Sequence, residues 1–233
     1  MKARGKSDHA PSILVLVAAL NEEEGIGPTL AELRECLPCS AFLVVDGRST
    51  DGTVNIAKNE GATVLLQRGH GKGDAIRHGV QSISEDFDYL VLTDADFTYP
   101  AAYIPNMIEM LEQNRELGMV CGNRFNSHLI IGYMRDVFYL GNKLLTLVHN
   151  MLNGVKLRDP LTGLRVIRWN IVKDWQPKSE GFDIEVELNH HVENQGYDIA
   201  EIDIAYRERV GIKKLSIKHG VSILRRIFLE IPQ

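Results

Sequence analysis

Tyr89-Leu-Val-Leu-Thr-Asp94-Ala-Asp96-Phe-Thr-Tyr-Pro100 is a short apolar strand that runs directly into two carboxylates separated by one alanine. Side chains alternate between the two faces of an extended chain, so we expect Asp94 and Asp96 to point the same way. Two like charges this close repel each other and lose hydration when buried, which favours a divalent cation as their partner. An exposed acidic turn closed by Pro100 is the alternative, because a lone Asp-x-Asp is a weak signal.

Three apolar runs precede this strand, and each is followed by a polar loop and a segment with helical spacing. We expect buried strands at 13–20, 41–45 and 62–66, and helices at 28–37, 54–60 and 74–82. This alternation predicts right-handed crossovers and a parallel, doubly wound sheet. The polar loops should therefore meet at the carboxyl ends of the strands, where open α/β sheets bind ligands.

The second half of the chain has a looser pattern. Its spacing predicts helices at 103–117, 133–153 and 182–194, short strands at 119–122 and 166–167, and an alternating edge strand at 197–206. No repeat or linker interrupts it. We therefore expect one α/β domain with a mostly parallel, Rossmann-like sheet over residues 12–214, followed by a basic amphipathic segment over residues 215–233.

Composition and motifs exclude several classes of protein. The formal net charge is −5, which gives no reason to expect a nucleic-acid partner. The chain contains neither a Gly-x-Gly-x-x-Gly after its first strand nor a Walker sequence, which argues against dinucleotide cofactors and P-loop chemistry. Cys36 and Cys39 fall between a helix and a strand without a second pair, so a redox or zinc site is not expected. The longest apolar run is too short to span a bilayer, which takes ~20 residues.

Seven short motifs occur in a characteristic order along the chain. They are Leu20-Asn21-Glu22-Glu23, Asp46-Gly-Arg-Ser-Thr-Asp51-Gly-Thr, Gly71-Lys72-Gly73, Thr93-Asp94-Ala-Asp96, Gly122-Asn-Arg124-Phe, Asp159-Pro-Leu-Thr-Gly163-Leu-Arg165, and Arg207-Glu-Arg209-Val-Gly211-Ile-Lys213-Lys214. Together they resemble the family 2 glycosyltransferases with the GT-A fold, in particular the polyprenyl (dolichyl) phosphate hexosyltransferases. The resemblance extends from Ile13 to about Leu215.

The resemblance implies transfer of a hexose or N-acetylhexosamine, with inversion, from a nucleotide sugar to a lipid phosphate. It implies that Asp46 contacts the base, and that Ala19, Asn21, Glu22, Lys72, Asp94 and Ala95 belong to the nucleotide site. It also implies metal dependence and catalytic roles for Asp94 and Asp96. Residue chemistry agrees, because a divalent ion on these carboxylates would neutralise a departing diphosphate. Hard oxygen ligands favour Mg²⁺ or Mn²⁺. A solvated surface lysine is the alternative for Lys72.

An anionic acceptor needs fixed positive charge beside an anionic donor. Arg124, Arg207 and Arg209 are candidates for binding the acceptor phosphate, because guanidinium groups bind phosphate oxygens bidentately. Lys213 and Lys214 match the basic end of the family's last motif and are expected to assist. An ionised phosphate needs no general base. The resemblance places Asp159 at the family's acidic loop position, which implies that it orients the acceptor or the metal shell. The alternative for Asp159 is a turn former before Pro160.

Two departures from the family pattern leave the substrate open. Ala18 replaces a proline that many relatives have, and Asp46-Gly47-Arg48-Ser49 replaces the common Asp-Asp-Gly-Ser. The Asp-Gly-x-Ser form also occurs in soluble relatives that glycosylate phosphoglycerate, so a phosphorylated small-molecule acceptor is the leading alternative. A nucleotidyltransferase and a catalytically silent nucleotide-sugar binder are more distant alternatives. Asn21-Glu22-Glu23-Glu24 stands where nucleotidyltransferases usually carry a basic, glycine-rich loop.

The last segment indicates a membrane surface. Ile217, Val221, Leu224 and Phe228 form one helical stripe, with Lys218 and Arg225 largely off it. A basic amphipathic helix of this kind can lie in a lipid headgroup layer. We therefore expect a protein of the cytoplasm that is peripheral on the cytoplasmic face of the membrane, although an ordinary packed helix is the alternative. The apolar segment 138–152 is better explained as a core helix than as a wall of the acceptor site.

Overall fold

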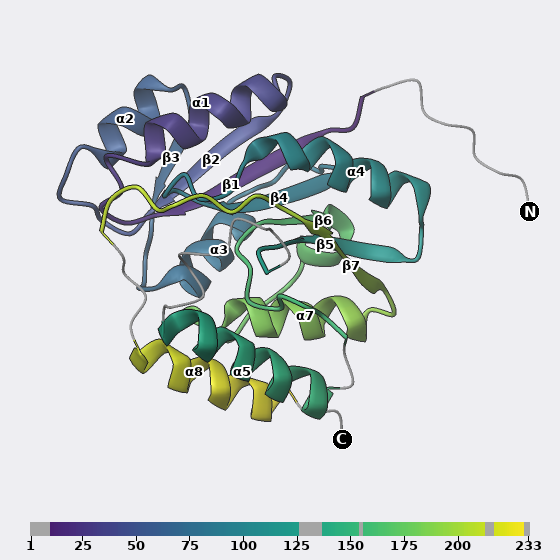
Figure 1. Ribbon diagram of the computed structural model, residues 1–233. Coiled ribbons are helices and arrows are strands. Elements are labelled where there is room, and N and C mark those ends of the chain that lie inside the picture. Colours follow the sequence, from purple (N-terminus) through teal and green to yellow (C-terminus); the bar gives the residue numbers. More distant parts are fainter. Residues whose placement is uncertain (1–9, 126–136, 154–155, 213–216, 231–233) are drawn as a thin grey trace, which may run out of the picture.

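The computed structural model describes residues 10–125, 137–153, 156–212 and 217–230 (Figure 1). The strands are β1 (Ile13–Ala19), β2 (Ala41–Asp46), β3 (Thr63–Leu66), β4 (Tyr89–Asp94), β5 (Leu117–Asn123), β6 (Arg165–Arg168) and β7 (Asp198–Asp203). The helices are α1 (Ile26–Cys36), α2 (Thr53–Asn59), α3 (Lys72–Gln81), α4 (Ile104–Gln113), α5 (Val137–Asn153), α6 (Trp169–Val172), α7 (Ile184–Asn194) and α8 (Ile217–Leu229), with a 3₁₀ turn, η1 (Ala101–Tyr103), before α4.

These elements agree with the predicted ones to within a few residues, with two exceptions. The single-turn helix α6 was not predicted, because four residues are too few to produce a periodic pattern. The predicted helix 133–153 is observed from Val137 onward, and residues 133–136 lie outside the described ranges. The buried strands β1, β2 and β4 consist almost wholly of apolar residues, which is the pattern of strands covered on both faces.

The strands form one sheet in the order β3-β2-β1-β4-β6-β5-β7. Strands β3, β2, β1 and β4 run parallel, as predicted, and β7 pairs with β5 at the edge of the sheet. Strand β6 differs from a fully parallel arrangement, since it is antiparallel to both β4 and β5. The chain enters β6 from the carboxyl edge of β4, so it must run back in the opposite direction. The expected mostly parallel α/β sheet is confirmed.

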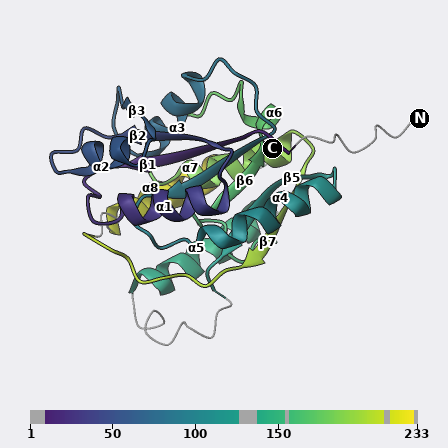
Figure 2. The ribbon, with the colours of Figure 1, turned by 90° about the horizontal axis from the view of Figure 1, so that it is seen from above.

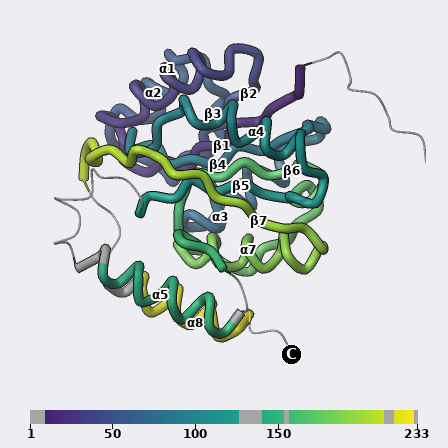
Figure 3. The backbone as a smooth tube through the Cα atoms, turned by 45° about the vertical axis from the view of Figure 1, so that its right-hand side comes forward, coloured from purple at the N-terminus to yellow at the C-terminus, as the bar shows by residue number. Residues whose placement is uncertain are grey.

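Helices cover both faces of the sheet. Helices α1 and α4 pack on one face through an apolar core that includes Leu30 and Met107, and α3 and α7 pack on the other through Ile76 and Leu188. Figure 1 shows these layers from the side, and Figure 2 shows the molecule from above. Helices α5 and α8 lie side by side on the far side of α7 from the sheet and form a third layer (Figure 3). Their buried contacts with α7 include Val186, Ile223 and Ile227.

Strand register brings the expected site loops to one edge. Ala19 of β1 is level with Asp46 of β2, and Ala18 is level with Asp94 of β4. After β7, the chain crosses back toward the carboxyl ends of β1 and β4 (Figure 1). We call residues 204–212 the return segment. The backbone N–H of Arg207 donates to the carbonyl of Thr98 at 2.9 Å, and that of Val210 donates to the carbonyl of Asp96 at 3.2 Å.

Candidate active site

Asp94 ends β4 and is paired with Lys72, the first residue of α3. The Lys72 ammonium lies 2.6 Å from Asp94 Oδ1 and 2.7 Å from Glu185 Oε1. Burial alone would lower the pKa of Lys72, but the charges of Asp94 and Glu185 raise it above its usual value. The Lys72 side chain is 12% exposed. A solvated surface lysine is therefore not what the structure contains, because this ammonium is a buried counter-ion between two carboxylates.

The backbone around Lys72 has room only for glycine. Gly71 has φ 87, and an added Cβ there would lie 2.2 Å from the carbonyl oxygen of Glu180. An added Cβ at Gly73 would lie 2.3 Å from the carbonyl oxygen of Ser179. Helix α3 begins at Lys72 as a result of this close approach between the Gly71–Gly73 loop and the loop before α7. The sequence motif thus serves to place the lysine.

Asp96 lies beyond the strand end and has a different set of partners. Arg209 Nη1 donates to Asp96 Oδ2 at 2.5 Å, and the same guanidinium is hydrogen-bonded to Glu22. Thr98 donates its hydroxyl to Asp96 Oδ1 at 2.6 Å. Burial and the charge of Asp94 raise the pKa of Asp96, against the opposing effects of Thr98 and Arg209. The return segment therefore places the Arg209 guanidinium against Asp96.

The predicted nucleotide loops form a connected network at the ends of β1 and β2. Asp46 is fully buried and accepts hydrogen bonds from Ser49, 2.9 Å from the backbone N–H and 2.5 Å from the hydroxyl. The Ser49 hydroxyl also accepts the N–H of Asn21 at 2.8 Å, and Gly47 donates its N–H to the carbonyl of Ala19. Ala95 is 2% exposed. The structure thus brings Ala19, Asn21 and Asp46 together.

Arg124 and Asp159 are joined in a buried ion pair. Arg124 Nε and Nη2 donate to the two oxygens of Asp159 at 2.7 and 2.8 Å, and the backbone N–H of Arg124 donates at 3.1 Å. Asp159 is 0% exposed and Arg124 is 8% exposed. Burial would lower the pKa of Arg124, but the charge of Asp159 raises it above its usual value. These two predicted site residues hold each other, across the gap between β5 and the loop before β6.

Arg207, another predicted acceptor-side cation, is separated from the acidic pair. Arg207 forms a bidentate pair with Glu32 of α1, at 2.6 and 2.8 Å, and its guanidinium lies over the Phe97 ring. The structure does not bring Arg207 to Asp94. Lys213 and Lys214 lie outside the described residues. Of the predicted acceptor-side residues, Arg209 alone directly contacts an acid of the pair among the contacts described here.

The acidic pair has the ligand chemistry of a magnesium or manganese site that a substrate completes. No cluster of three or more His, Cys, Asp or Glu side chains that could hold a metal ion occurs in the described part of the chain. Mg²⁺ is commonly held by one or two carboxylates, with water and substrate phosphates supplying the other oxygens. Asp94, 30% exposed, and Asp96 provide such carboxylates. In this structure their charges are balanced by Lys72 and Arg209.

Two residues at the site were missed by sequence reasoning. Glu185 lies in the first turn of α7 and contacts Lys72. An acidic residue at a helix start normally indicates only a favourable interaction with the helix dipole, so nothing in the sequence marked it as part of the site. Ser49 stood inside a quoted motif but received no role, and the structure gives it the central position between Asp46 and Asn21.

Together, the mixed sheet and its acidic carboxyl edge define the GT-A fold. A family model described as glycosyl transferase family 2 matches residues 14–175, well over half of the chain. The chain therefore belongs to glycosyl transferase family 2. The resemblance inferred from the seven motifs is thereby confirmed.

Sequence relatives support this membership. A dolichyl-phosphate hexose transferase of Haloferax volcanii is 31% identical over 94% of this chain and 93% of its own length. An undecaprenyl-phosphate mannosyltransferase of Micrococcus luteus is 27% identical over 88% of this chain and 87% of its own length. A low-salt glycan biosynthesis hexosyltransferase of Haloferax volcanii is 29% identical, and there the chain spans only 55% of the relative.

Solved structures share the fold. A glucosyl-3-phosphoglycerate synthase from Mycobacterium tuberculosis, solved with phosphoglyceric acid, superposes with a TM-score of 0.74 over 96% of this chain and 81% of that chain, at 19% identity. The same synthase with Mn²⁺, UDP-glucose and phosphoglyceric acid gives a TM-score of 0.72 at 19% identity, over 95% of this chain and 78% of that chain. At this identity the likeness establishes the fold alone.

Proposed function

We propose that this protein transfers a hexose or N-acetylhexosamine from a nucleotide sugar to polyprenyl phosphate, with inversion at the anomeric carbon. The observation that carries the proposal is the end-to-end similarity to a dolichyl-phosphate hexose transferase, 31% identical over 94% of this chain. A second relative, an undecaprenyl-phosphate mannosyltransferase, has the same class of lipid phosphate in its name. In this reaction a phosphate oxygen of the acceptor bonds to the anomeric carbon while the nucleoside diphosphate departs.

The donor is assigned to the edge formed by β2, β1 and β4. Asp46 and the backbone near Ala19 and Asn21 hold the nucleoside, and Ala95 belongs to the same nucleotide site. Glu22 lies on the same edge and anchors Arg209. Lys72 stands beside Asp94, where its ammonium group can turn a hydrogen bond from Asp94 to diphosphate oxygens while it keeps its contact with Glu185. Lys72 and Arg209 are paired with carboxylates in this structure, and the negatively charged donor would offer them phosphate oxygens as partners instead.

Asp94 and Asp96 are proposed to hold Mg²⁺ or Mn²⁺ with the donor. The bound ion would act as a Lewis acid on the departing diphosphate. The chain's own part is to orient both carboxylates. Thr98 and the return segment fix Asp96, and Lys72 fixes Asp94. An added Cβ at Gly163 would lie 2.5 Å from Asp94 Oδ2, so the backbone of this glycine confines the Asp94 carboxylate.

The acceptor phosphate is assigned to the arginine side of the site. Arg209 is the leading contact because it lies against Asp96, with Arg124, Arg207, Lys213 and Lys214 as further candidates. Asp159 orients Arg124 through two hydrogen bonds. An ionised acceptor phosphate carries its own nucleophilic oxygen, so no general base is required. This accounts for a site with many cations and no histidine beside the acidic pair among the contacts described here.

The lipid is proposed to reach the site from a membrane surface formed by α5 and α8. Exposed apolar side chains follow one face of α5, namely Leu140, Leu144, Leu147 and Met151, and Val221, Leu224, Phe228 and Leu229 lie exposed on α8. Neither helix contains an acidic residue, and they carry Lys143, Lys218 and Arg225 in a chain of net charge −5. Arg226 is instead engaged in ion pairs with Asp183 and Glu187. An apolar face with basic flanks matches an anionic bilayer surface. We call this the α5–α8 face, and we assign it to the cytoplasmic side.

No helix in the described ranges is both long and apolar enough to cross a membrane. The sequence pattern favoured a core helix for 138–152, but more than half of the surface of Leu140, Leu144 and Leu147 is exposed. The reason is that α5 packs on α8 and α7 rather than on the sheet. A periodic apolar pattern predicts a helix, but it does not show whether every apolar face of that helix packs against another element.

The experiment is a transfer assay with radiolabelled UDP-glucose, UDP-N-acetylglucosamine, UDP-galactose and GDP-mannose, each with Mn²⁺ or Mg²⁺ and polyprenyl phosphate in detergent. Product is extracted into organic solvent. We expect label in the organic phase with at least one donor, and none when the metal is chelated. Label that is transferred to 3-phosphoglycerate instead would replace this proposal with the soluble-acceptor alternative, which the shared fold of the synthase structures keeps as the second candidate.

A further inference from the structure

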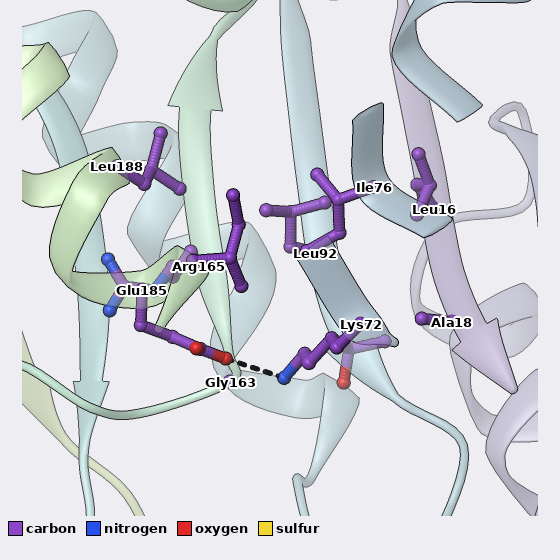
Figure 4. Close-up of a pocket in the computed structure, with 11 residues that line it drawn as sticks. Leu16, Ala18, Lys72, Ile76, Leu92, Gly163, Arg165, Glu185 and Leu188 are labelled. Atoms are coloured by element: carbon purple, nitrogen blue, oxygen red, sulfur yellow. Dashed lines mark ion pairs between the residues drawn. The ribbon is translucent and has the colours of Figure 1, made fainter. Parts of the chain in front are cut away.

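A pocket lies beside Asp94, between α3 and α7. Apolar side chains line one end of it, including Ile76, Leu92 and Leu188, and Lys72 and Glu185 approach each other from opposite sides at the other end (Figure 4). The cavity itself has room for little more than a water molecule, so a larger ligand would meet Lys72 and Glu185 at its polar end rather than fill it.

Glu185 has one oxygen in use and one without a partner. Its side chain is 7% exposed, and Oε1 lies 2.7 Å from the Lys72 ammonium. Its second oxygen, Oε2, is buried and has no hydrogen-bond partner among the described residues. A buried carboxylate oxygen left unpaired is destabilising, and native proteins rarely keep one without a reason. Here the missing donor is best supplied by a ligand at the polar end of the pocket.

The order of the strands places this oxygen relative to the donor. Along the carboxyl edge, Asp46 ends β2 and Asp94 ends β4, and Glu185 of α7, which packs on one face of the sheet, is linked to Asp94 through Lys72. A nucleoside at Asp46 and a diphosphate at Asp94 thus leave the sugar next to Lys72 and Glu185. One ammonium group separates the Asp94 and Glu185 carboxylates, so a sugar attached to the diphosphate comes within reach of Glu185.

We propose that Glu185 recognises the donor sugar, with its free Oε2 accepting hydrogen bonds from sugar hydroxyl groups while Lys72 holds Oε1. This inference rests on the proposed function and names the residue that selects the sugar. A carboxylate oxygen accepts and cannot donate, so the subsite requires a hydroxyl at the ring position that faces α7. Donors that lack that hydroxyl leave Oε2 unpaired and bind weakly.

The test compares nucleotide sugars with bare nucleotides by isothermal titration calorimetry in the presence of Mn²⁺. The probes are UDP, GDP, UDP-glucose, UDP-N-acetylglucosamine, UDP-galactose and GDP-mannose. For each nucleotide sugar that binds, we expect Glu185→Gln to weaken its affinity about 10-fold or more, and to change the affinity of the matching nucleoside diphosphate less than about 3-fold. Equal weakening of both ligands, or no weakening of either, would overturn the inference.

Two further measurements keep the test independent of folding. Glu193→Gln, on the same helix but outside the pocket lining, is the matched control and is expected to behave as the parent protein. If Glu185→Gln fails to fold, deoxy analogues of the bound donor are titrated into the parent protein. One analogue should then lose about 10-fold or more in affinity. Equal affinity for all of the deoxy analogues would refute the role of Glu185.

These results distinguish failure of the role of Glu185 from failure of the proposed transfer to polyprenyl phosphate. Donor binding involves no lipid, so a selective effect of Glu185→Gln stands even if polyprenyl phosphate accepts no label. A protein that binds the donors but shows no selective effect contradicts the Glu185 assignment alone. A protein that binds none of the six probes overturns both.

Discussion

At the scale of single residues, the carboxylates Asp94 and Asp96 are each matched to a cation from elsewhere in the chain. Lys72 pairs with Asp94, and Arg209 pairs with Asp96. In the ligand-free protein these pairs prevent two close negative charges from facing each other unscreened. When a donor diphosphate binds with its metal ion, the metal can pair with the two carboxylates and the diphosphate with the two cations. Binding can therefore exchange ion pairs without leaving a charged group unpaired.

Asp94→Asn and Asp96→Asn should each lower kcat by about 100-fold or more, because each removes a proposed metal ligand. Both amides are isosteric with the acids, so the fold should persist. The measurement is transfer rate against Mn²⁺ concentration, with far-ultraviolet circular dichroism as the check on folding. Asp198→Asn, an exposed residue on the edge strand β7, is the control. Unchanged turnover in either site variant would refute the metal assignment.

Arg124 and Arg209 should respond differently to substitution, although the sequence assigns both to the acceptor phosphate. Arg124→Met leaves the fully buried Asp159 without its partner and is expected to cost about 3–5 kcal/mol in free energy of unfolding. Arg209→Met removes the cation that the buried acids Glu22 and Asp96 share, but Arg209 itself is 24% exposed, so we expect a smaller cost of about 1–3 kcal/mol while transfer falls about 100-fold. Urea unfolding and the transfer assay separate the two. Equal effects on stability would contradict this distinction.

At the scale of secondary-structure elements, the start of α3 depends on glycine. Gly71→Ala places a Cβ against the Glu180 carbonyl at a positive φ, and we expect it to cost about 2 kcal/mol or more in free energy of unfolding. Gly141→Ala is the matched control, because a Cβ at Gly141 of α5 meets nothing within 4 Å. That substitution should stabilise the protein by about 0.5–1 kcal/mol. Denaturant unfolding measures both, and a destabilising Gly141→Ala would contradict the open space seen there.

The α5–α8 face should bind anionic bilayers through both helices together. Leu144→Gln combined with Phe228→Gln removes one exposed apolar side chain from each helix, and should lower partitioning onto phosphatidylglycerol vesicles about 10-fold or more. Co-sedimentation is the measurement, with nucleotide binding as the check that the site is intact. Leu66→Gln, which changes an exposed leucine on β3, should leave partitioning unchanged. Parent protein that stays wholly in solution would argue against the membrane assignment.

At the scale of the whole molecule, two buried histidines lie at the interface between the α5–α8 layer and α7. His149 of α5 and His190 of α7 have ring centroids 5.9 Å apart, and their Nε2 atoms have no hydrogen-bond partner in the described residues. Burial lowers the pKa of His149 to about 4 and also lowers the pKa of His190. Both rings are therefore neutral in the folded protein at neutral pH.

Stability should therefore fall as the solution becomes acidic. A histidine whose folded pKa lies below its ordinary value contributes stability above pH ~6.5, and loses it as pH falls toward its folded pKa. For His149 the loss between neutral pH and pH 4 amounts to up to about 3 kcal/mol. The free energy of unfolding measured in urea across this range should decline less steeply for His149→Gln. His70→Gln, an exposed site, should keep the slope of the parent, and an equal slope for His149→Gln would contradict this account.

The sequence by itself determined which polar loops meet at the carboxyl edge of β2, β1 and β4, where we propose that the donor binds. Asp46, Asp94 and the glycines around Lys72 each follow an apolar run or begin a helix, so their positions derive from local periodicity and from the rule that parallel strands end at one edge. The family motifs added the membership that the relatives confirm. The same local logic placed β1 to β4 in a parallel sheet, because each strand is joined to the next by a helical crossover.

Only the tertiary structure decided which charges meet. Arg209 reaches Asp96 across 113 residues and Glu22 across 187, and Lys72 meets Glu185 of α7, contacts that leave no periodic trace in the sequence. The reversed direction of β6 and the exposed face of α5 are likewise set by packing between distant segments. Local pattern fixes what a segment can become, whereas ion pairing and burial depend on every element that packs against it. For that reason Glu185, with one oxygen on Lys72 and one free in the pocket, became visible only in three dimensions.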